Sequence, residues 1–257
     1  MERQLLICLF FIFALSSCQT SGTPTSSIEQ KIEKSEKLIE TEIQYTNIWD
    51  YIVQNSNTEN ESYLDDMTLE FINKHLKNKD NFDEYLSNSY FFIYYVVQEL
   101  EAANLPVELA LIPFIESNYD PFSISPSGAV GLWQFMPKTG RFYNLEKSWW
   151  NEDRHDPYRS THAAIGYFKY LFDRFDNEIY LALAAYNAGP TYLDRQINKN
   201  KRKNLSTDFW SLNLNDQVTN YIPKYIAIRE IIFNSEKYGV KLPEIPVESV
   251  VKKIEIP

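Results

Sequence analysis

The stretch IYLALAAYNAG at 179–189 decides the fold class. Its first eight residues are apolar on almost every face, which is typical of a helix buried in the centre of a helical protein. It ends in Asn187 and Gly189, and glycine is the residue that most often closes a helix. The alternation of apolar and polar residues that marks a half-buried strand does not occur in it. The stretch therefore predicts a central helix with a polar residue at its C-terminal end.

Helical spacing continues on both sides of this stretch. Apolar residues recur every three or four positions over 82–100, 164–175 and 222–231. The run FFIYYVV at 91–97 has the propensity of a buried strand, but the longer spacing around it favours one continuous helix. Ser160 is the expected N-cap of the second segment. Because no strand pattern and no internal repeat accompanies these segments, the sequence predicts an all-α domain.

Composition narrows the range of partners. The chain has 257 residues, a formal net charge of −10, and 15% aromatic residues. The acidic balance argues against a nucleic-acid partner, because phosphate neutralisation needs clustered Lys and Arg, and KNKRK at 199–203 is the one dense basic stretch. The histidines at 75, 155 and 162 have no metal-ligand spacing with one another or with a cysteine. No metal and no other cofactor is therefore expected.

The N-terminus has the features of an export signal. The apolar run LLICLFFIFAL at 5–15 is too short to cross a bilayer of roughly 30 Å as a helix. It is followed by LSSC at 15–18, which resembles the lipobox of bacterial lipoproteins, where lipid is attached to the cysteine. A plain signal peptide with a chance cysteine is the alternative. We expect lipid on Cys18 and a membrane location, and Gln19 lacks the Asp that favours inner-membrane retention in enteric lipoproteins.

These features divide the chain into three parts. Residues 1–17 are the expected lipoprotein signal peptide, and 18–66 are a lipid-anchored tether with a helical extension. Residues 67–257 form the expected catalytic domain, with a core at about 100–240. The residues that follow KLP at 241–243 leave no room for a further wall-binding module, so binding is expected to depend on the domain itself.

Three polar motifs interrupt the apolar helical segments. Glu116 and Ser117 follow an apolar helix that Pro113 interrupts, and a carboxyl group in such a setting is partly desolvated if it lines a cleft. Desolvation disfavours the ionised form and allows a glutamic acid to act as a general acid near neutral pH. SPSGAVGLWQFMPKTG at 125–140 is a glycine-containing loop that leads into a short helix, and AYNAG at 185–189 closes the central helix.

These motifs, in this order, resemble the lytic transglycosylase domain of the murein transglycosylases, in the goose-type lysozyme superfamily. The matching elements are ES at 116–117, GLWQxMPxT at 131–139, AYNAG at 185–189 and Tyr221 in YIPKY. The similarity extends over about 100–240, and its details are most similar to the membrane-bound branch of the family. The resemblance implies a lysozyme-like, goose-type helical domain with a substrate cleft. It also implies peptidoglycan glycan strands as the substrate and the periplasmic face of the bacterial outer membrane as the location.

The resemblance also implies a role for each matching residue. Glu116 matches the single catalytic acid and base. The residues that match substrate-binding positions are Ser117, Gln134, Tyr186, Asn187 and Tyr221. Of these, Tyr221 matches a tyrosine that faces the catalytic carboxylate. Trp133 stands where many relatives have Met, and its ring is expected either to stack on a sugar or to belong to the core.

The number of carboxylates separates two reactions. Glycoside hydrolysis ordinarily uses two carboxyl groups, whereas a single one can suffice where the N-acetyl group of the substrate assists. Asp120 and Asp156 each precede a proline, which is a turn signature, so both are expected to be structural. The resemblance then implies a non-hydrolytic reaction that leaves 1,6-anhydro-N-acetylmuramic acid ends. A goose-type muramidase and a non-catalytic peptidoglycan-binding scaffold are the alternatives.

Overall fold

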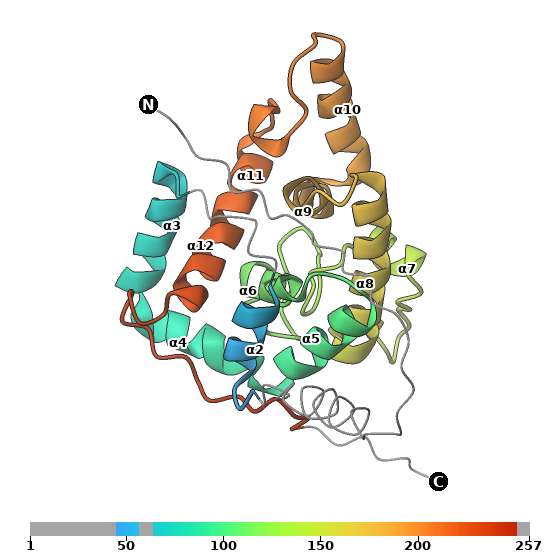
Figure 1. The fold of residues 1–257 in the computed structure, drawn as a ribbon. Helices are drawn as coiled ribbons and strands as arrows, with labels where there is room; N and C mark the ends of the chain where they lie inside the picture. The colour runs from blue at the N-terminus through green and yellow to red at the C-terminus, as the bar shows by residue number, and fades with distance from the viewer. Residues whose placement is uncertain (1–44, 57–63, 251–257) are drawn as a thin grey trace, which may run out of the picture. The chain divides into compact units, whose positions relative to one another are not determined.

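Helices make up the regular structure of the chain. The computed structural model describes residues 45–56 and 64–250, and among them it contains isolated β-bridges but no strand (Figure 1). The all-α prediction is confirmed for this part of the chain. The expected signal peptide, Cys18 and the tether lie outside the described residues. No helix within the described ranges is long and apolar enough to cross a membrane.

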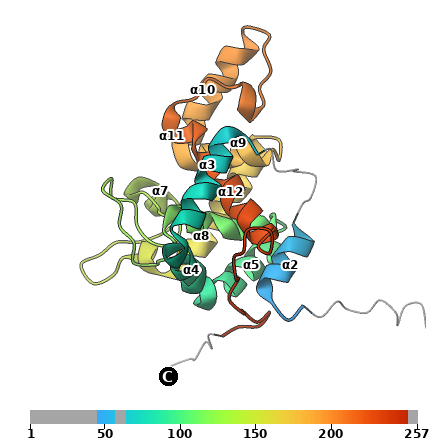
Figure 2. The same ribbon diagram turned by 90° about the vertical axis from the view of Figure 1, so that its left-hand side faces the viewer.

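The helices are joined by connections of unequal length, and the long segment 117–136 joins α6 to α7 (Figures 1 and 2). The α-helices are α2 (Ile48–Asn55), α3 (Asp66–Lys77), α4 (Lys79–Asn88), α5 (Ile93–Ala102), α6 (Ile112–Glu116), α7 (Pro137–Phe142), α8 (Pro157–Arg174), α9 (Ile179–Ala188), α10 (Pro190–Lys201), α11 (Asp216–Thr219) and α12 (Tyr221–Phe233). Short 3₁₀ helices are η1 (Ser89–Phe91), η2 (Val107–Leu111), η3 (Asp153–His155) and η4 (Phe209–Ser211).

The predicted central helix is α9. Residues 181–185 are all buried, and α8, α10, α11 and α12 pack against this helix. Gly189 has a φ of 85°, which stops the helix, and Pro190 begins α10 directly afterwards. Proline is well suited to this first position because its missing N–H has no intrahelical partner there. The prediction for 179–189 is therefore confirmed, and α12 occupies the segment predicted around 222–231.

The prediction of one continuous helix over 82–100 is wrong in one respect. The segment forms α4 and α5 with the 3₁₀ turn η1 between them. The Ser89 hydroxyl donates to the carbonyl of Leu86, and the Phe92 N–H bonds to the Ser89 carbonyl in place of a residue four positions back. The apolar side of the segment stays buried across the break, so the sequence pattern does not reveal it.

The N-cap of α8 also differs from the prediction. Asp156, not Ser160, is the N-cap, and its carboxylate accepts from the N–H groups of Tyr158 and Arg159. Pro157 at the first helical position favours an extended conformation for the residue before it, as an N-cap requires. Ser160 lies within the first turn and donates to the Asp156 carbonyl.

Helix α2, which precedes residue 67, packs onto helices that follow it. One compact unit spans Tyr45–Pro257, because α2 contributes three fully buried side chains to the core. The indole of Trp49 donates to the Pro243 carbonyl at 2.8 Å, and the Ile48 N–H donates to the Ile245 carbonyl at 2.8 Å. These bonds join α2 to the segment that follows α12.

A buried arginine fixes the loop between α6 and α7. The Arg154 guanidinium donates to the carbonyls of Gly128, at 3.0 Å, and Phe135, at 2.8 Å. The same group forms a bidentate pair with Glu152, and its hydrogen bonds, together with its positive charge, lower the pKa of that carboxyl to about 2. The loop approaches Arg154 so closely that a Cβ on Gly131 would lie 1.8 Å from the Arg154 carbonyl oxygen.

We expect Gly131→Ala to lower the free energy of unfolding by more than about 3 kcal/mol, because the added Cβ overlaps backbone and the φ of 82° is strained for alanine. Gly128→Ala is the matched control. Gly128 has a φ of 84° but no atom within 4 Å of the added Cβ, so only the cost of the left-handed backbone, about 1 kcal/mol, is expected. Urea unfolding measures both values, and equal losses would contradict the steric argument.

Candidate active site

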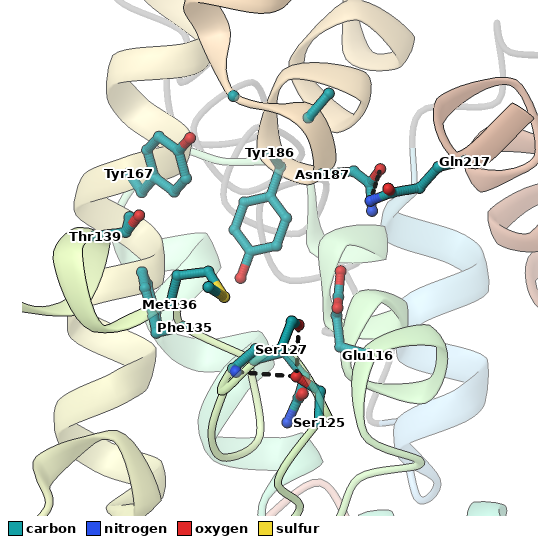
Figure 3. Close-up of a pocket in the computed structure, with 14 residues that line it drawn as sticks. Glu116, Ser125, Ser127, Phe135, Met136, Thr139, Tyr167, Tyr186, Asn187 and Gln217 are labelled. Atoms are coloured by element: carbon teal, nitrogen blue, oxygen red, sulfur yellow. Dashed lines mark hydrogen bonds between the residues drawn. The ribbon is translucent and has the colours of Figure 1, made fainter. Parts of the chain in front are cut away.

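A cavity of about 470 Å³ lies where the ends of several helices meet (Figure 3). Its wall comes from the C-terminal end of α6, the segment 125–139, α8, the C-terminal end of α9, and α11. Figure 3 shows Glu116 on one side of the cavity and Thr139 and Tyr167 on the opposite side, with Tyr186 between them. The cavity therefore brings together residues that are up to about 100 positions apart in the sequence.

Glu116 supplies the only carboxyl group among the described residues that line this cavity. The Tyr221 hydroxyl, on α12, donates to Glu116 Oε1 at 2.6 Å. Burial raises the pKa of Glu116 from 4.5 to about 7, although the Tyr221 hydrogen bond and the positive charge of Lys224 each lower it. At neutral pH the group is therefore divided between its protonated and ionised forms, as a group that must both donate and accept a proton requires.

Local backbone geometry explains why Glu116 faces the cavity. Pro113 occupies the first turn of α6, and the N–H groups of Ser117 and Tyr119 both bond to its carbonyl. Asn118 and Tyr119 have φ values of 54° and 61°, so the chain reverses directly after the carboxylate. Tyr119 is completely buried, and its hydroxyl donates to the carbonyl of Ala110. Positive φ is costly for a tyrosine and persists because this burial holds the ring in place.

Ser117 does not line the cavity. Its hydroxyl lies 2.8 Å from the Leu132 carbonyl and 3.2 Å from the Pro113 carbonyl, and the residue is buried. A hydroxyl has one proton to donate, and here that proton is directed to backbone carbonyls. In this structure the side chain joins the end of α6 to the loop that carries Gln134, and the role of Ser117 in orienting substrate stays a prediction.

Gln134 lines the cavity with a φ of 50°. Its amide nitrogen donates to the carbonyls of Gly131, at 2.9 Å, and Ser123, at 3.2 Å. The residue before it, Trp133, is completely buried, and its indole N–H donates to Thr161 Oγ1 at 3.0 Å. Of the two alternatives for Trp133, the structure therefore supports a core residue.

Tyr186 and Asn187 line the cavity from the end of α9. The Tyr186 hydroxyl donates to the Trp133 carbonyl at 2.6 Å, and its ring stacks on Phe168 with centroids 4.7 Å apart. The Asn187 side-chain oxygen accepts a longer hydrogen bond, 3.4 Å, from Gln217 on α11. Tyr186 is thus held firmly by its neighbours, whereas the Asn187 amide keeps most of its hydrogen-bonding capacity for a ligand.

Tyr221 is buried and is not part of the cavity wall. It reaches the site through its hydrogen bond to Glu116. The expectation that Tyr221 faces the catalytic carboxylate agrees with this bond, and a contact between Tyr221 and substrate stays a prediction.

Asp120 and Asp156 do not line the cavity. Asp120 accepts from the N–H of Phe122 in a turn, and Asp156 caps α8. These bonds are the structural roles that the Asp-Pro pairs predict. Among the described residues, no group of three or more His, Cys, Asp and Glu side chains is placed to hold a metal ion.

Several residues of the cavity wall were not predicted. Ser125, Ser127, Met136 and Thr139 lie within the quoted loop motif, but nothing in their local pattern separates them from ordinary loop residues. Tyr167 and Gln217 come from helical segments that carry no motif. Only the packing of α8 and α11 against the loop and α9 brings these two side chains to the cavity.

Comparisons with known proteins find a matching family model and related sequences. Residues 95–209 match the family model of the Transglycosylase SLT domain. The chain is 38% identical over 170 residues to membrane-bound lytic murein transglycosylase D of Escherichia coli (strain K12), a match that covers 66% of this chain and 38% of that protein. It is 32% identical over 108 residues to membrane-bound lytic murein transglycosylase F of Alcanivorax borkumensis, covering 40% of this chain and 22% of that protein.

A solved structure is also similar: an inactive mutant of lytic transglycosylase Slt from Pseudomonas aeruginosa, with 25% identity, a TM-score of 0.42, and coverage of 57% of this chain and 24% of that one. The match to the E. coli relative spans 38% of the length of that protein. The resemblance to the lytic transglycosylase domain, predicted from four short motifs, is confirmed.

We expect Tyr221→Phe to raise the pKa of Glu116 by about one pH unit, because the lost hydrogen bond stabilises the ionised carboxylate. Carbon-13 NMR of the glutamate carboxyl groups measures this pKa, with Glu116→Gln identifying the resonance. Tyr225→Phe is the matched control on the same helix, because the Tyr225 hydroxyl is buried without a hydrogen-bond partner. An unchanged pKa in Tyr221→Phe would show that the hydrogen bond does not control ionisation.

Proposed function

We propose that the protein is a peptidoglycan lytic transglycosylase that cleaves the β-1,4 bond between N-acetylmuramic acid and N-acetylglucosamine without water. The proposed product is a glycan end with a 1,6-anhydro ring. The match of residues 95–209 to the Transglycosylase SLT domain and the identity to relatives named lytic murein transglycosylases support the reaction class. The observation that carries the proposal is the single carboxyl group in the cavity, whose pKa is about 7.

The first half-reaction needs a proton donor. At pH 7 about half of the Glu116 side chains are protonated, so the group can protonate the glycosidic oxygen as the bond breaks. The positive charge that develops at the sugar ring is met by the N-acetyl carbonyl of the substrate, since no second carboxylate lines the described cavity. This assistance by the substrate distinguishes the scheme from hydrolysis with two carboxyl groups.

The second half-reaction needs a base. Glu116, now ionised, takes the proton of the C6 hydroxyl, and the C6 oxygen attacks C1 to close the anhydro ring. The proton that left the carboxyl group in the first step is thereby replaced, and the enzyme returns to its starting state. One group serves both steps, which is why a pKa near the working pH is favourable.

Other residues of the site have supporting roles in this scheme. Tyr221 orients the carboxyl group through its hydrogen bond and limits the rise in its pKa. Asn187 offers its amide group to the sugars, and Gln134 offers its side-chain oxygen, because its amide nitrogen is bonded to two carbonyls. Tyr186 forms part of the cavity wall. Ser117 is a positioning residue, because it fixes the end of α6 on the loop at 131–134.

Two alternatives are less well supported. A goose-type muramidase would need a second carboxylate to direct a water molecule, and neither Asp120 nor Asp156 lines the cavity. A non-catalytic glycan-binding scaffold does not require a carboxyl group with a raised pKa in its cleft. Glu116 has such a pKa, and shifts of this kind are typical of catalytic sites.

The proposed location is the periplasmic face of the outer membrane, through lipid on Cys18. In this division residues 1–17 are the signal peptide, 18–66 contain the tether, and 67–257 contain the catalytic domain. The lipobox-like LSSC at 15–18 and the membrane-bound relatives support the anchor.

We expect Glu116→Gln to reduce the release of anhydro-muropeptides from purified sacculi by about 10⁴-fold or more. General acid–base catalysis typically contributes about 10²–10⁴-fold, and this residue serves both half-reactions. Mass spectrometry of the released muropeptides measures the loss. Asp120→Asn and Asp156→Asn are the controls, since both keep side chains that can accept the same backbone hydrogen bonds.

The same assay separates the alternatives. Reducing-end products from the wild type, abolished by Asp120→Asn or Asp156→Asn in a folded protein, would indicate a hydrolase.

Unfolding at pH 8 checks the fold of Glu116→Gln. The raised pKa of Glu116 means that its contribution to stability is present below pH 4.5 and is lost as the pH rises through 7. The neutral amide is therefore expected to leave the protein about 1–3 kcal/mol more stable at pH 8.

The anchor is tested with Cys18→Ala. This variant has no thiol to receive lipid, so it is expected to fractionate as soluble or to remain uncleaved, whereas the wild type is processed and sediments with membranes. Fractionation and mass measurement of the N-terminus provide the readout. A processed Cys18→Ala protein that still sediments with membranes would rule out lipid as the anchor.

A further inference from the structure

Two adjacent tryptophans lie on the surface of the connection between α7 and α8. Trp149 is 82% exposed and Trp150 is 86% exposed, and their rings contact each other edge to face with centroids 4.0 Å apart. Phe142, the last residue of α7, is exposed as well. In Figure 2 this connection extends outward from the helices. Large aromatic rings that contribute nothing to the core in this way are typical of an interaction surface.

The two rings lie at the tip of a short hairpin, residues 146–153, which we call the tryptophan hairpin. The Ser148 N–H donates to the Asn151 carbonyl at 2.7 Å, and the Asp153 N–H donates to the Glu146 carbonyl at 2.9 Å. The carboxylate of Asp153, which is buried, accepts from the Glu146 N–H at 3.0 Å. Because these bonds fix the backbone of the tip, little conformational entropy is lost when a ligand covers the rings.

The surroundings of the rings are cationic, in a protein of net charge −10. Residues 138–150 contain Lys138, Arg141 and Lys147 but only one acid, Glu146, and all four side chains are exposed. Lys138 and Arg141 form no salt bridge with any described residue. Exposed tryptophans together with Lys and Arg are typical of protein surfaces that lie at the interface of a bilayer.

We propose that the tryptophan hairpin inserts into the headgroup region of an anionic lipid bilayer, with Lys138 and Arg141 facing the phosphates. The inference rests on the proposed function, in which lipid on Cys18 holds the domain beside a membrane. An indole has an apolar ring and a polar N–H, and both are satisfied at a bilayer interface. Two rings alone bind a bilayer weakly, so the contact depends on the high local concentration that the anchor provides. It would determine which side of the domain faces the membrane.

A glycan strand is the other ligand with which tryptophans often stack. The planes of Trp149 and Trp150 are at 85° to each other, so the rings do not form one flat platform for neighbouring sugars. Uncharged sugar rings also gain nothing from the excess of cations in residues 138–150. The geometry and the charge therefore both favour the anionic bilayer.

The test measures quenching of tryptophan fluorescence by brominated lipid, with the full chain and vesicles of phosphatidylethanolamine and phosphatidylglycerol. Trp49 and Trp133 are buried and out of reach of lipid, and Trp210 is half-buried. We expect bromolipid to quench the wild type and to leave the double variant Trp149→Ser with Trp150→Ser unquenched. Trp210→Phe is the control, and it is expected to keep the wild-type quenching.

The role of the cations is tested with Lys138→Gln and Arg141→Gln together. We expect the ratio of quenched to unquenched protein to fall about tenfold, because each cation near an anionic surface contributes to binding, and added salt should have the same effect. Lys74→Gln with Lys77→Gln is the matched control. These exposed lysines are also three residues apart, on α3, which Figure 1 shows on the opposite side from α7. The control is expected to keep the wild-type ratio.

Several outcomes overturn the proposal. They are absence of quenching in the wild type, quenching that survives loss of both tryptophans, an equal fall in the two charge variants, and equal quenching when phosphatidylcholine replaces phosphatidylglycerol. The glycan alternative is measured in the Glu116→Gln background, where bound strands are not cleaved. We expect the two tryptophan substitutions to leave the affinity for glycan strands unchanged, and a loss would assign the hairpin to sugar.

The proposed function is judged by other measurements. Flotation of the same vesicle samples reports whether lipid holds the chain, and release of anhydro products by the wild type reports the reaction. A chain that floats but is not quenched overturns the hairpin contact and leaves the anchor in place. A chain that neither floats nor is quenched overturns both the hairpin contact and the anchor.

Discussion

The site depends on one constraint: a carboxyl group must lose much of its hydration and still face a space that a ligand can enter. Glu116 meets this constraint at the C-terminal end of α6, where burial raises its pKa to about 7. A desolvated carboxylate without a donor would be costly, and the Tyr221 hydroxyl on α12 supplies that donor at 2.6 Å. The relative placement of α6 and α12 thus sets the protonation of the group as well as its direction.

The rest of the cavity wall near Glu116 includes backbone with unusual dihedral angles. Asn118, Tyr119 and Gln134 all have positive φ, and each is fixed by buried side chains or by hydrogen bonds to carbonyl groups. Arg154 then holds the loop from its far side through two carbonyls and Glu152. Strain of this kind persists only where the surroundings determine the conformation completely, and it favours a cavity that is formed before the ligand arrives.

The core and the site share the same elements. α9 is buried along most of its length, yet its last turn supplies Tyr186 and Asn187 to the cavity. α8 packs on α9 and carries Tyr167 to the place where the cavity meets a second groove, which runs between α7 and α8. A change in the packing of these two helices would therefore affect both spaces.

The sequence by itself determined the features that depend on neighbouring residues. The apolar character of α9 on almost every face, the apolar spacing of α12 and the end of α9 at Gly189 were all predictable, because helix periods and caps act over a few residues. The tertiary structure decided the features that depend on distant contacts. The break at Ser89, the inward hydroxyl of Ser117, the burial of Trp133 and the place of Gln217 in the cavity were not predictable from local pattern. Apart from the break at Ser89, whose bonds to Leu86 and Phe92 are local, each is fixed by residues that lie farther away in the chain. The pKa of Glu116 also depends on distant residues, since solvation is a property of the folded surroundings and not of the residue.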